Sequence, residues 1–296
     1  MVTLKYTSLE NIMLTHVSVN QIITRPQPWA APQTGIVHLN HKNTLAGSIE
    51  QFEPISLAEM VAVALLNRVD QKFLISRDQL ISILQSVQGD YRVLTINNKS
   101  LNAYRTLYFD TSDYKLYKLH VNQSAERYKV RLREYLNGHE SYLEVKHKTR
   151  KDRTIKDRIS ANGLTDYLRA DTVKWIKKYY PFDARELEPK IWNTFTRLTL
   201  VNRLNPERIT IDTNLFFSTN EKYVNLAGLV VVEVKTDSKF KTSPFLAEME
   251  RRRIHPQGFS KYCIGISMLC DNVKRNELKE KILKVEKITK GVEIHG

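Results

Sequence analysis

Four cations alternate with apolar residues in one short stretch of the chain, the sequence RYKVRLR at positions 127–133. Successive side chains of an extended strand point to opposite faces, so Arg127, Lys129, Arg131 and Arg133 would share one face. Guanidinium groups pair with phosphate oxygens through two parallel hydrogen bonds, and their charge does not titrate away. The spacing predicts either a charged face bathed in water or a surface that holds a strongly anionic ligand.

The same alternation recurs in other stretches that are rich in β-branched and aromatic residues, and these are expected to be strands. The expected strands are 104–111, 127–135, 141–147, 190–200, 208–217 and 229–236. Helical patterns cover 164–180 and 243–253. Most strands follow one another with few helices between them, which favours an α+β protein built on an antiparallel sheet or a closed barrel.

A half-solvated sheet explains the alternation in any single strand. Six such strands with many arginines on the polar side favour another geometry, in which charged faces point inward and apolar faces pack against helices. Like charges about 6 Å apart repel by roughly 3 kcal/mol at an effective dielectric near 20, so such a lumen needs water or an anion. A polyphosphate chain would supply the counter-charge. The expected fold is therefore an α+β protein with an antiparallel closed β-barrel, a basic lumen and flanking helices.

Three acidic residues fall on the charged sides of these strands, namely Glu144, Asp212 and Glu233. Each can form ion pairs with neighbouring Lys and Arg, or one or two of them can hold a hard divalent ion through carboxylate oxygens. Glu233 is the first candidate ligand because it is the only acid on its face of a short apolar strand, and Glu144 is the second.

The composition limits the partners and the compartment. The chain has 296 residues, with 46 Lys and Arg against 32 Asp and Glu, so a formal charge of +14 suits nucleic acid, anionic lipid or phosphorylated small molecules. The two cysteines, Cys263 and Cys270, are too few for a disulfide framework, which favours a reducing cytoplasm. No apolar run approaches the roughly 18 residues of a membrane helix, so no membrane insertion is expected.

Three segments are expected along the chain. Residues 1–51 read as a poorly ordered leader, residues 52–271 as the domain that carries the strands, and residues 272–296 as an amphipathic C-terminal helix that packs on or near it. Two capping boxes mark helix starts inside the domain, Ser56 with Glu59 and Ser76 with Gln79.

Eight ordered stretches resemble the VTC domain of the vacuolar transporter chaperone family, and more closely the bacterial proteins described as polyphosphate polymerase domain-containing. These stretches are 52–60, 66–75, 104–111, 127–135, 142–148, 208–215, 231–235 and 259–265. The resemblance covers roughly residues 52–270. It implies membership of the triphosphate tunnel metalloenzymes, whose fold is an eight-stranded antiparallel tunnel lined with basic residues.

The resemblance and the alternation together predict the site. The residues expected to act in catalysis are Arg131, Arg133, Lys146, Arg208 and Lys261. Further phosphate contacts are expected from Lys72, Arg105, Arg127, Lys129, Lys148, Arg197, Lys235 and Ser260. Glu233, with Glu144, is expected to hold Mn²⁺ or Mg²⁺, and ATP and inorganic polyphosphate are the expected partners.

The expected reaction is transfer of the ATP γ-phosphate to a growing polyphosphate chain. Two alternatives stay open, a triphosphatase with the same lumen and a non-catalytic binder of polyphosphate or nucleotide. A nucleic-acid binder would use the strand tyrosines as stacking platforms. Tyr104, Tyr108, Tyr128 and Tyr142 are instead expected to pack as core with their apolar neighbours, and no nucleic-acid partner is expected.

Overall fold

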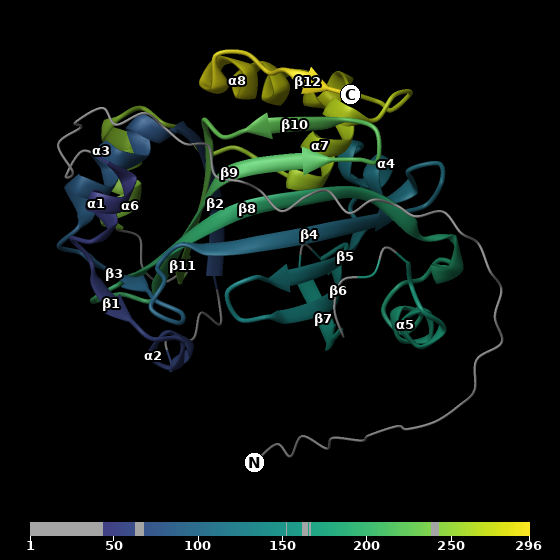
Figure 1. Ribbon diagram of the computed structural model, residues 1–296, viewed down its shortest axis with the longest axis horizontal. Helices are drawn as coiled ribbons and strands as arrows, with labels where there is room; N and C mark the ends of the chain where they lie inside the picture. The colour runs from purple at the N-terminus through teal and green to yellow at the C-terminus, as the bar shows by residue number, and fades with distance from the viewer. Residues whose placement is uncertain (1–43, 63–67, 152, 162–164, 166, 238–242) are drawn as a thin grey trace. The chain divides into compact units, whose positions relative to one another are not determined.

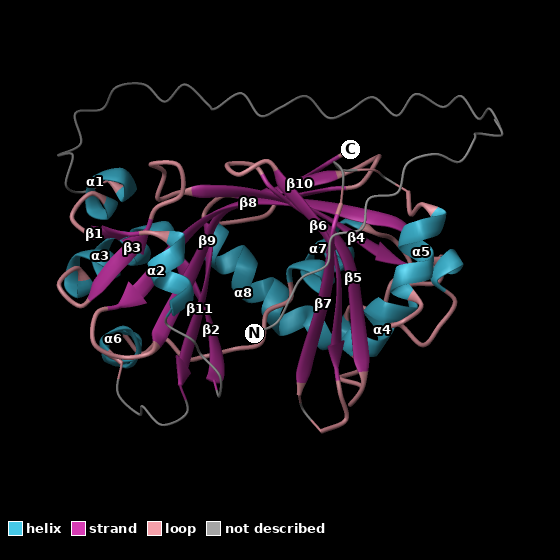
Figure 2. Cartoon of the chain, turned by 90° about the horizontal axis from the view of Figure 1, so that it is seen from below, coloured by secondary structure: helices cyan, strands magenta, loops and turns pink. Residues whose placement is uncertain are grey.

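The alternating stretches form one large sheet (Figures 1 and 2). The computed structural model describes residues 44–62, 68–151, 153–161, 165, 167–237 and 243–296. Its strands are β1 (Glu53–Ile55), β2 (Arg68–Ser76), β3 (Tyr91–Leu94), β4 (Asn102–Asp110), β5 (Arg127–Tyr135), β6 (Glu140–Lys148), β7 (Thr154–Ser160), β8 (Glu188–Asn202), β9 (Glu207–Ser218), β10 (Tyr223–Leu226), β11 (Leu229–Asp237) and β12 (Ile294–His295).

Eight of these strands run antiparallel in the order β2, β11, β9, β8, β4, β5, β6 and β7. The pairing shifts register between Tyr108 and Phe109 and between Thr194 and Thr196, and Asn214 has a left-handed φ of 53°. Such bulges bend a strand and increase its twist. The sheet therefore curves. Two groups of strands, β2–β11 and β5–β6–β7, extend to the same side of the long strands β8, β9 and β4, and we call these groups the two wings (Figure 2).

Ten helical segments connect the strands within the described residues. They are α1 (Leu45–Ile49), α2 (Leu57–Ala62), α3 (Arg77–Val87), α4 (Lys115–Val121), α5 (Ala170–Ile176), α6 (Pro244–Arg251), α7 (Lys261–Leu269), α8 (Lys279–Thr289) and the short 3₁₀ helices η2 (Ala184–Glu186) and η3 (Asn276–Leu278). Both expected capping boxes are present, because Ser56 and Glu59, and Ser76 and Gln79, exchange side-chain to backbone hydrogen bonds.

Most of the helices cover the sheet's outer face, which we define as the face of Ile211, Val232 and Val130. Residues of α1, α3 and α6 bury this face of the β2–β11 wing, and residues of α4 and α5 bury that of the β5–β6 wing. Apolar burial of about 25 cal/mol per Å² drives this packing. The expectation that apolar strand faces pack against helices is confirmed.

The opposite face, which we call the inner face, is apolar at one end. There α7 and α8 pack against Leu215, Phe217 and Val231, together with Ile191 and Phe195 of β8. Seen between the wings, both helices lie behind the space that the wings flank (Figure 2). The remainder of the inner face carries the charged residues.

The expected closed barrel is not confirmed. Within the described residues, β2 pairs only with β11 and β7 only with β6, so hydrogen bonds do not join the two ends of the eight-strand path. An antiparallel sheet with flanking helices is what the structure shows.

The first and the last helix of the described chain both pack against the sheet. Described structure begins before residue 52, because Leu45 and Ile49 of α1 are buried with the β2–β11 wing. The rest of the expected leader, residues 1–43, lies outside the described residues. At the other end of the chain α8 buries Val285 against the sheet.

The cysteines and the helices bear on the expectations about disulfides and about membrane insertion. Both cysteines are buried and free. None of the helices in the described parts of the chain has the length and apolar character that a membrane crossing requires.

Candidate active site

Strand pairing places cations from both wings on the inner face. Directly opposed residues of antiparallel strands share a face. Lys72 of β2 lies opposite Glu233 of β11, and Lys235 lies opposite Arg208 of β9. In the other wing, Arg131 of β5 lies opposite Glu144 of β6. The common parity runs across all eight strands, so these groups face one space.

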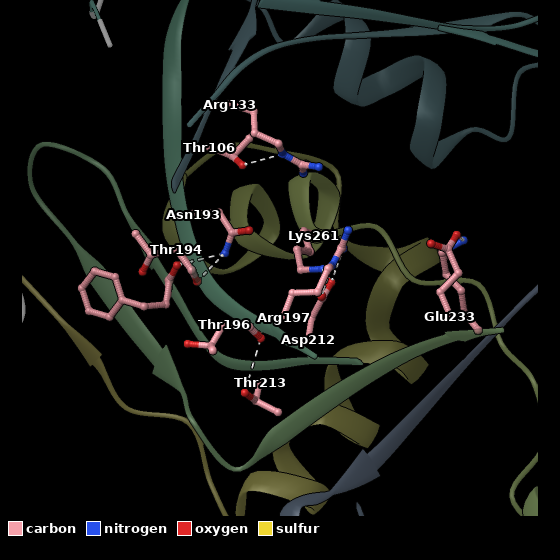
Figure 3. Close-up of polar contacts among 12 residues, drawn as sticks. Thr106, Arg133, Asn193, Thr194, Thr196, Arg197, Asp212, Thr213, Glu233 and Lys261 are labelled. Atoms are coloured by element: carbon pink, nitrogen blue, oxygen red, sulfur yellow. Dashed lines mark hydrogen bonds and ion pairs between the residues drawn. The ribbon is translucent and has the colours of Figure 1, made fainter. Parts of the chain in front are cut away.

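A buried ion triad stands at the centre of this face (Figure 3). Asp212 of β9 accepts two hydrogen bonds from Arg197 of β8, at 2.6 Å from Nε and 2.8 Å from Nη2, and it also pairs with Lys261 at the start of α7. Despite its burial, the charges of Arg197 and Lys261 hold the pKa of Asp212 well below its usual range. The triad fixes two cations in place, and one carboxylate cannot neutralise both.

The other two carboxylates are also shared between cations. Glu144, with 1% of its side chain exposed, pairs with Arg131 at 2.6 Å and with Lys156 of β7. Glu233 pairs with Lys72 at 2.8 Å and with Lys235. Arg131, Arg133 and Lys156 outweigh the desolvation of Glu144 and lower its pKa to about 2. Each carboxylate therefore leaves an excess of positive charge.

Several cations of the inner face have no carboxylate partner within the described residues, and three of them come from β5 and β6. Arg133 is 6% exposed and donates to the Thr106 hydroxyl at 3.3 Å, and Lys129 donates to Ser260 Oγ at 3.0 Å. The Lys146 side chain forms no hydrogen bond or ion pair with a described residue. Arg133 is a buried cation without a counter-ion, which is costly. The half-buried Lys129 and the exposed Lys146 add positive charge on the same two strands, so these groups define where an anion binds most favourably.

The lowered pKa values of two lysines show that these positive charges lie close together. Burial, together with the charges of Arg131 and Lys72, lowers the pKa of Lys129 to about 8. Lys146 touches water, yet protein surrounds its ammonium group, and this loss of hydration together with Lys129, Arg131 and Lys72 lowers its pKa to about 7. Lys72 belongs to the opposite wing. The two wings are therefore close enough for their charges to interact.

Among the described residues, a loop joins the free edges of the two wings, between which the strands do not pair. The backbone N–H of Gln257 donates to the Lys72 carbonyl of β2 at 2.8 Å, and three residues later Ser260 accepts from Lys129 of β5. Three residues of extended chain span at most about 11 Å. Residues 257–261 thus tie β2 to β5 across the inner face and set the width of the site.

The structure brings most of the predicted residues together. Those on the inner face or at the start of α7 are Lys72, Arg127, Lys129, Arg131, Arg133, Glu144, Lys146, Lys148, Arg197, Arg208, Glu233, Lys235, Ser260 and Lys261. Arg105 is not among them. It lies opposite Glu134 on the outer face, donates to that carboxylate at 3.0 Å and stacks on Trp192. Its strand parity with Leu107 and Phe109 explains this placement.

Sequence reasoning missed part of the site on β7. Lys156 pairs with Glu144, and Arg158 lies opposite Glu144. The alternation of Lys156 and Arg158 with Ile155 and Ile159 is the sequence signal that could have predicted this strand. The strand β7 was not among those expected.

The expectation that the strand tyrosines pack as core is confirmed for Tyr104, Tyr108 and Tyr128, which are buried in hydrophobic clusters, whereas Tyr142 is half-buried. Tyr128 lies on the outer face and packs there, as expected. Tyr104, Tyr108 and Tyr142 lie opposite Phe195, Arg131 and Arg133 respectively, on the inner face. Tyrosines therefore line the same face as the phosphate-binding candidates.

The acidic residues fit a divalent ion only in the company of other oxygen ligands. No group of three or more His, Cys, Asp or Glu side chains within the described residues could hold a metal. Mg²⁺ is commonly bound by one or two carboxylates plus substrate phosphates. Glu233, with 23% of its side chain exposed, can serve in that way, whereas Glu144 is buried between two cations.

The chain is similar to known proteins in sequence and in structure. No curated protein matches the sequence. Similar solved structures include a candidate adenylate cyclase from Bacillus halodurans, with 14% identity, TM-score 0.46, and coverage of 69% of this chain and 98% of that one. Another is a candidate adenylyl cyclase from Hippeastrum described as having a dominant triphosphatase activity, with 11% identity, TM-score 0.41, and coverage of 68% and 96%. The VTC domain model matches residues 67–270, more than two thirds of the chain, and the protein belongs to the VTC domain family.

Proposed function

We propose that the protein transfers the γ-phosphate of ATP to a growing polyphosphate chain. The observation that supports this proposal is the convergence of Arg133, Lys129 and Lys146, which have no carboxylate partner among the described residues, beside the Arg197–Asp212–Lys261 triad. Membership of the VTC domain family supports phosphoryl handling at the same place. ATP and inorganic polyphosphate are the proposed partners, and cytoplasm is the proposed location.

Positioning and charge neutralisation would do most of the catalytic work. Arg197 and Lys261 would hold the non-bridging oxygens of the γ-phosphate, while Arg131, Arg133 and Lys146 would hold the phosphates on its nucleotide side. A terminal oxygen of the acceptor chain forms a new bond to the γ-phosphorus, the bond to the β–γ bridging oxygen breaks, and ADP leaves with that electron pair. The attacking oxygen is already anionic, so no general base is required.

Glu233 is the residue that would hold Mn²⁺ or Mg²⁺ together with the substrate phosphates. The ion, when bound, neutralises charge on adjacent phosphate oxygens. Lys72 and Lys235 flank Glu233 and orient its carboxylate. They also provide positive charge for the same phosphates.

Triphosphate hydrolysis is the second candidate function. The apolar end of the inner face, where α7 and α8 pack, shortens the charged surface available to a phosphate chain. A short charged surface favours a short substrate, with water in place of the acceptor chain. Product analysis separates the two reactions.

The test is incubation of the purified protein with ATP and Mn²⁺, followed by separation of phosphate products by chain length. Long-chain polyphosphate with stoichiometric ADP supports the polymerase. Orthophosphate as the only phosphate product would leave the hydrolase, and tight ATP binding with neither product would leave a non-catalytic binder.

Two matched variants connect the activity to the inner face. Lys146→Met removes a cation that holds no carboxylate, so no buried charge is left unpaired, and it is expected to lower turnover roughly 10- to 100-fold through loss of a charged contact to phosphate. Arg105→Met removes a cation from the outer face and is expected to keep turnover near that of the wild type. Equal effects of both variants would contradict the proposed site.

A further inference from the structure

An unbroken row of aromatic side chains crosses one end of the inner face. Phe195 of β8 stacks on Tyr104 of β4 at 5.1 Å, Tyr104 meets Tyr135 of β5 at 5.0 Å, and Tyr135 meets Tyr142 of β6 edge-on at 5.8 Å. The Arg158 guanidinium of β7 lies 4.5 Å from the centre of the Tyr142 ring. Five neighbouring strands each contribute one member.

The row changes from buried to open along its length. Phe195 and Tyr104 are 3% and 8% exposed, whereas Tyr135 and Tyr142 are half-buried and Arg158 is exposed. Core packing explains the first two members. It does not explain why Tyr142 and Arg158 stack on each other at the rim.

The contacts of Tyr142 and Arg158 with described residues leave both side chains available to a ligand. The Tyr142 hydroxyl donates to Glu140 at 3.0 Å, which fixes the ring, and Arg158 has no carboxylate partner within the described residues. An arginine on an aromatic ring forms a flat platform, and such platforms bind the faces of nucleobases.

The platform borders the phosphate-binding residues. Tyr142 lies directly opposite Arg133, and along β6 it is two residues from Glu144, the partner of Arg131. Two residues of a strand span about 7 Å, a separation that a ribose can bridge. A nucleotide whose phosphates lie at Arg133 would place its base at Tyr142.

We propose that Tyr142 and Arg158, supported by Tyr135, form a nucleobase subsite, so that the site selects nucleoside triphosphates over inorganic triphosphate. This inference rests on the proposed function, because it requires phosphates at Arg133 and its neighbours. Stacking does not read the hydrogen-bonding edges of a base, so the subsite accepts different bases.

The test compares ATP and tripolyphosphate as ligands of the full-length protein by calorimetry. Tyr142→Ala is expected to weaken ATP binding about tenfold, as loss of a stacking platform does, and to leave the tripolyphosphate affinity within twofold of the wild type. Tyr142→Phe keeps the ring and is expected to bind both ligands as the wild type does. Tyr223→Ala, which removes a tyrosine from β10, is the matched control and is expected to change neither affinity.

A comparison on the wild type alone requires no variant. ATP is expected to bind about tenfold more tightly than methyl triphosphate, which has the same phosphates and no base. Equal affinities for these two ligands, or equal losses of ATP and tripolyphosphate in Tyr142→Ala, would overturn the subsite while leaving the phosphate site intact. Absence of binding of every triphosphate to the wild type would overturn the proposed function and the subsite together.

Discussion

Lys129 shows how single side chains make the site responsive to an anion. Its ammonium group is buried, donates to a neutral hydroxyl and lies among other cations, so burial and then charge repulsion lower its pKa to about 8. A bound phosphate would supply the missing negative charge and raise this pKa. Binding is therefore expected to take up protons at about pH 8 and above.

The affinity for tripolyphosphate should consequently fall as pH rises above 8. The free protein holds the proton on Lys129 below its lowered pKa and loses it above, whereas the complex keeps the proton. Linkage then predicts a loss of up to about tenfold per pH unit for each such lysine. Calorimetric titrations at pH 7, 8 and 9 measure this slope.

Lys129→Arg is the control for this slope, because arginine stays charged throughout the range. The variant is expected to show a shallower loss of affinity between pH 8 and 9. Identical slopes for the variant and the wild type would show that Lys129 does not carry the effect.

At the scale of elements, helix α7 positions Ser260 and Lys261, which lie at its N-terminal end. The Tyr262 hydroxyl donates to the buried Asp110, which also accepts the N–H groups of Leu116 and Tyr117. Burial raises the pKa of Asp110. This contact holds α7 against the ends of β4 and α4, and Lys261 reaches Asp212 from there.

Gly265 permits the close approach of α7 to the sheet. A Cβ at this position would lie 2.6 Å from Phe217 Cδ1 and 2.7 Å from Ile191 Cδ1. Gly265→Ala is expected to lower the free energy of unfolding by about 1–3 kcal/mol through overpacking and to weaken tripolyphosphate binding by displacing Lys261.

Denaturant unfolding and calorimetry of the same variant measure both effects. Gly89→Ala is the matched control, because a Cβ there meets no atom within 4 Å. A Gly265→Ala protein as stable as the Gly89→Ala protein, with wild-type affinity, would refute this role of α7.

At the scale of the whole molecule, hydrogen bonds among the described residues do not join β2 to β7, and the loop 257–261 ties the wings of the sheet together. Each of these edge strands pairs with one described strand, so its amides exchange hydrogen through small local openings. A polyanion that contacts Lys72 and Lys146 at once would join the two wings.

Tripolyphosphate is therefore expected to slow amide hydrogen exchange in β2 and β6 as well as in residues 257–261. Hydrogen exchange with mass spectrometry measures this change, and Lys146→Met, which lacks one side of the bridge, is expected to show a smaller effect in β6. Protection confined to residues 257–261 would mean that the ligand contacts the loop without joining the wings.

Much of this architecture could be predicted from the sequence because its signals are local. The structure contains the capping boxes at Ser56 and Ser76 and the strand alternation at Arg131 and Glu233. The family resemblance is matched by the VTC domain model. The placement of Arg105 and the inward tyrosines could not be settled in the same way. They depend on which face a whole strand presents after long-range pairing.

The sequence by itself determined that arginine and lysine share one face within each strand, since the period of two is a property of the extended backbone. Tertiary structure decided which faces meet, where α7 ends the charged surface, and that a loop rather than a strand ladder connects β2 to β5. The reason is that these features come from contacts between residues far apart in the chain, whose register is set by bulges and core packing.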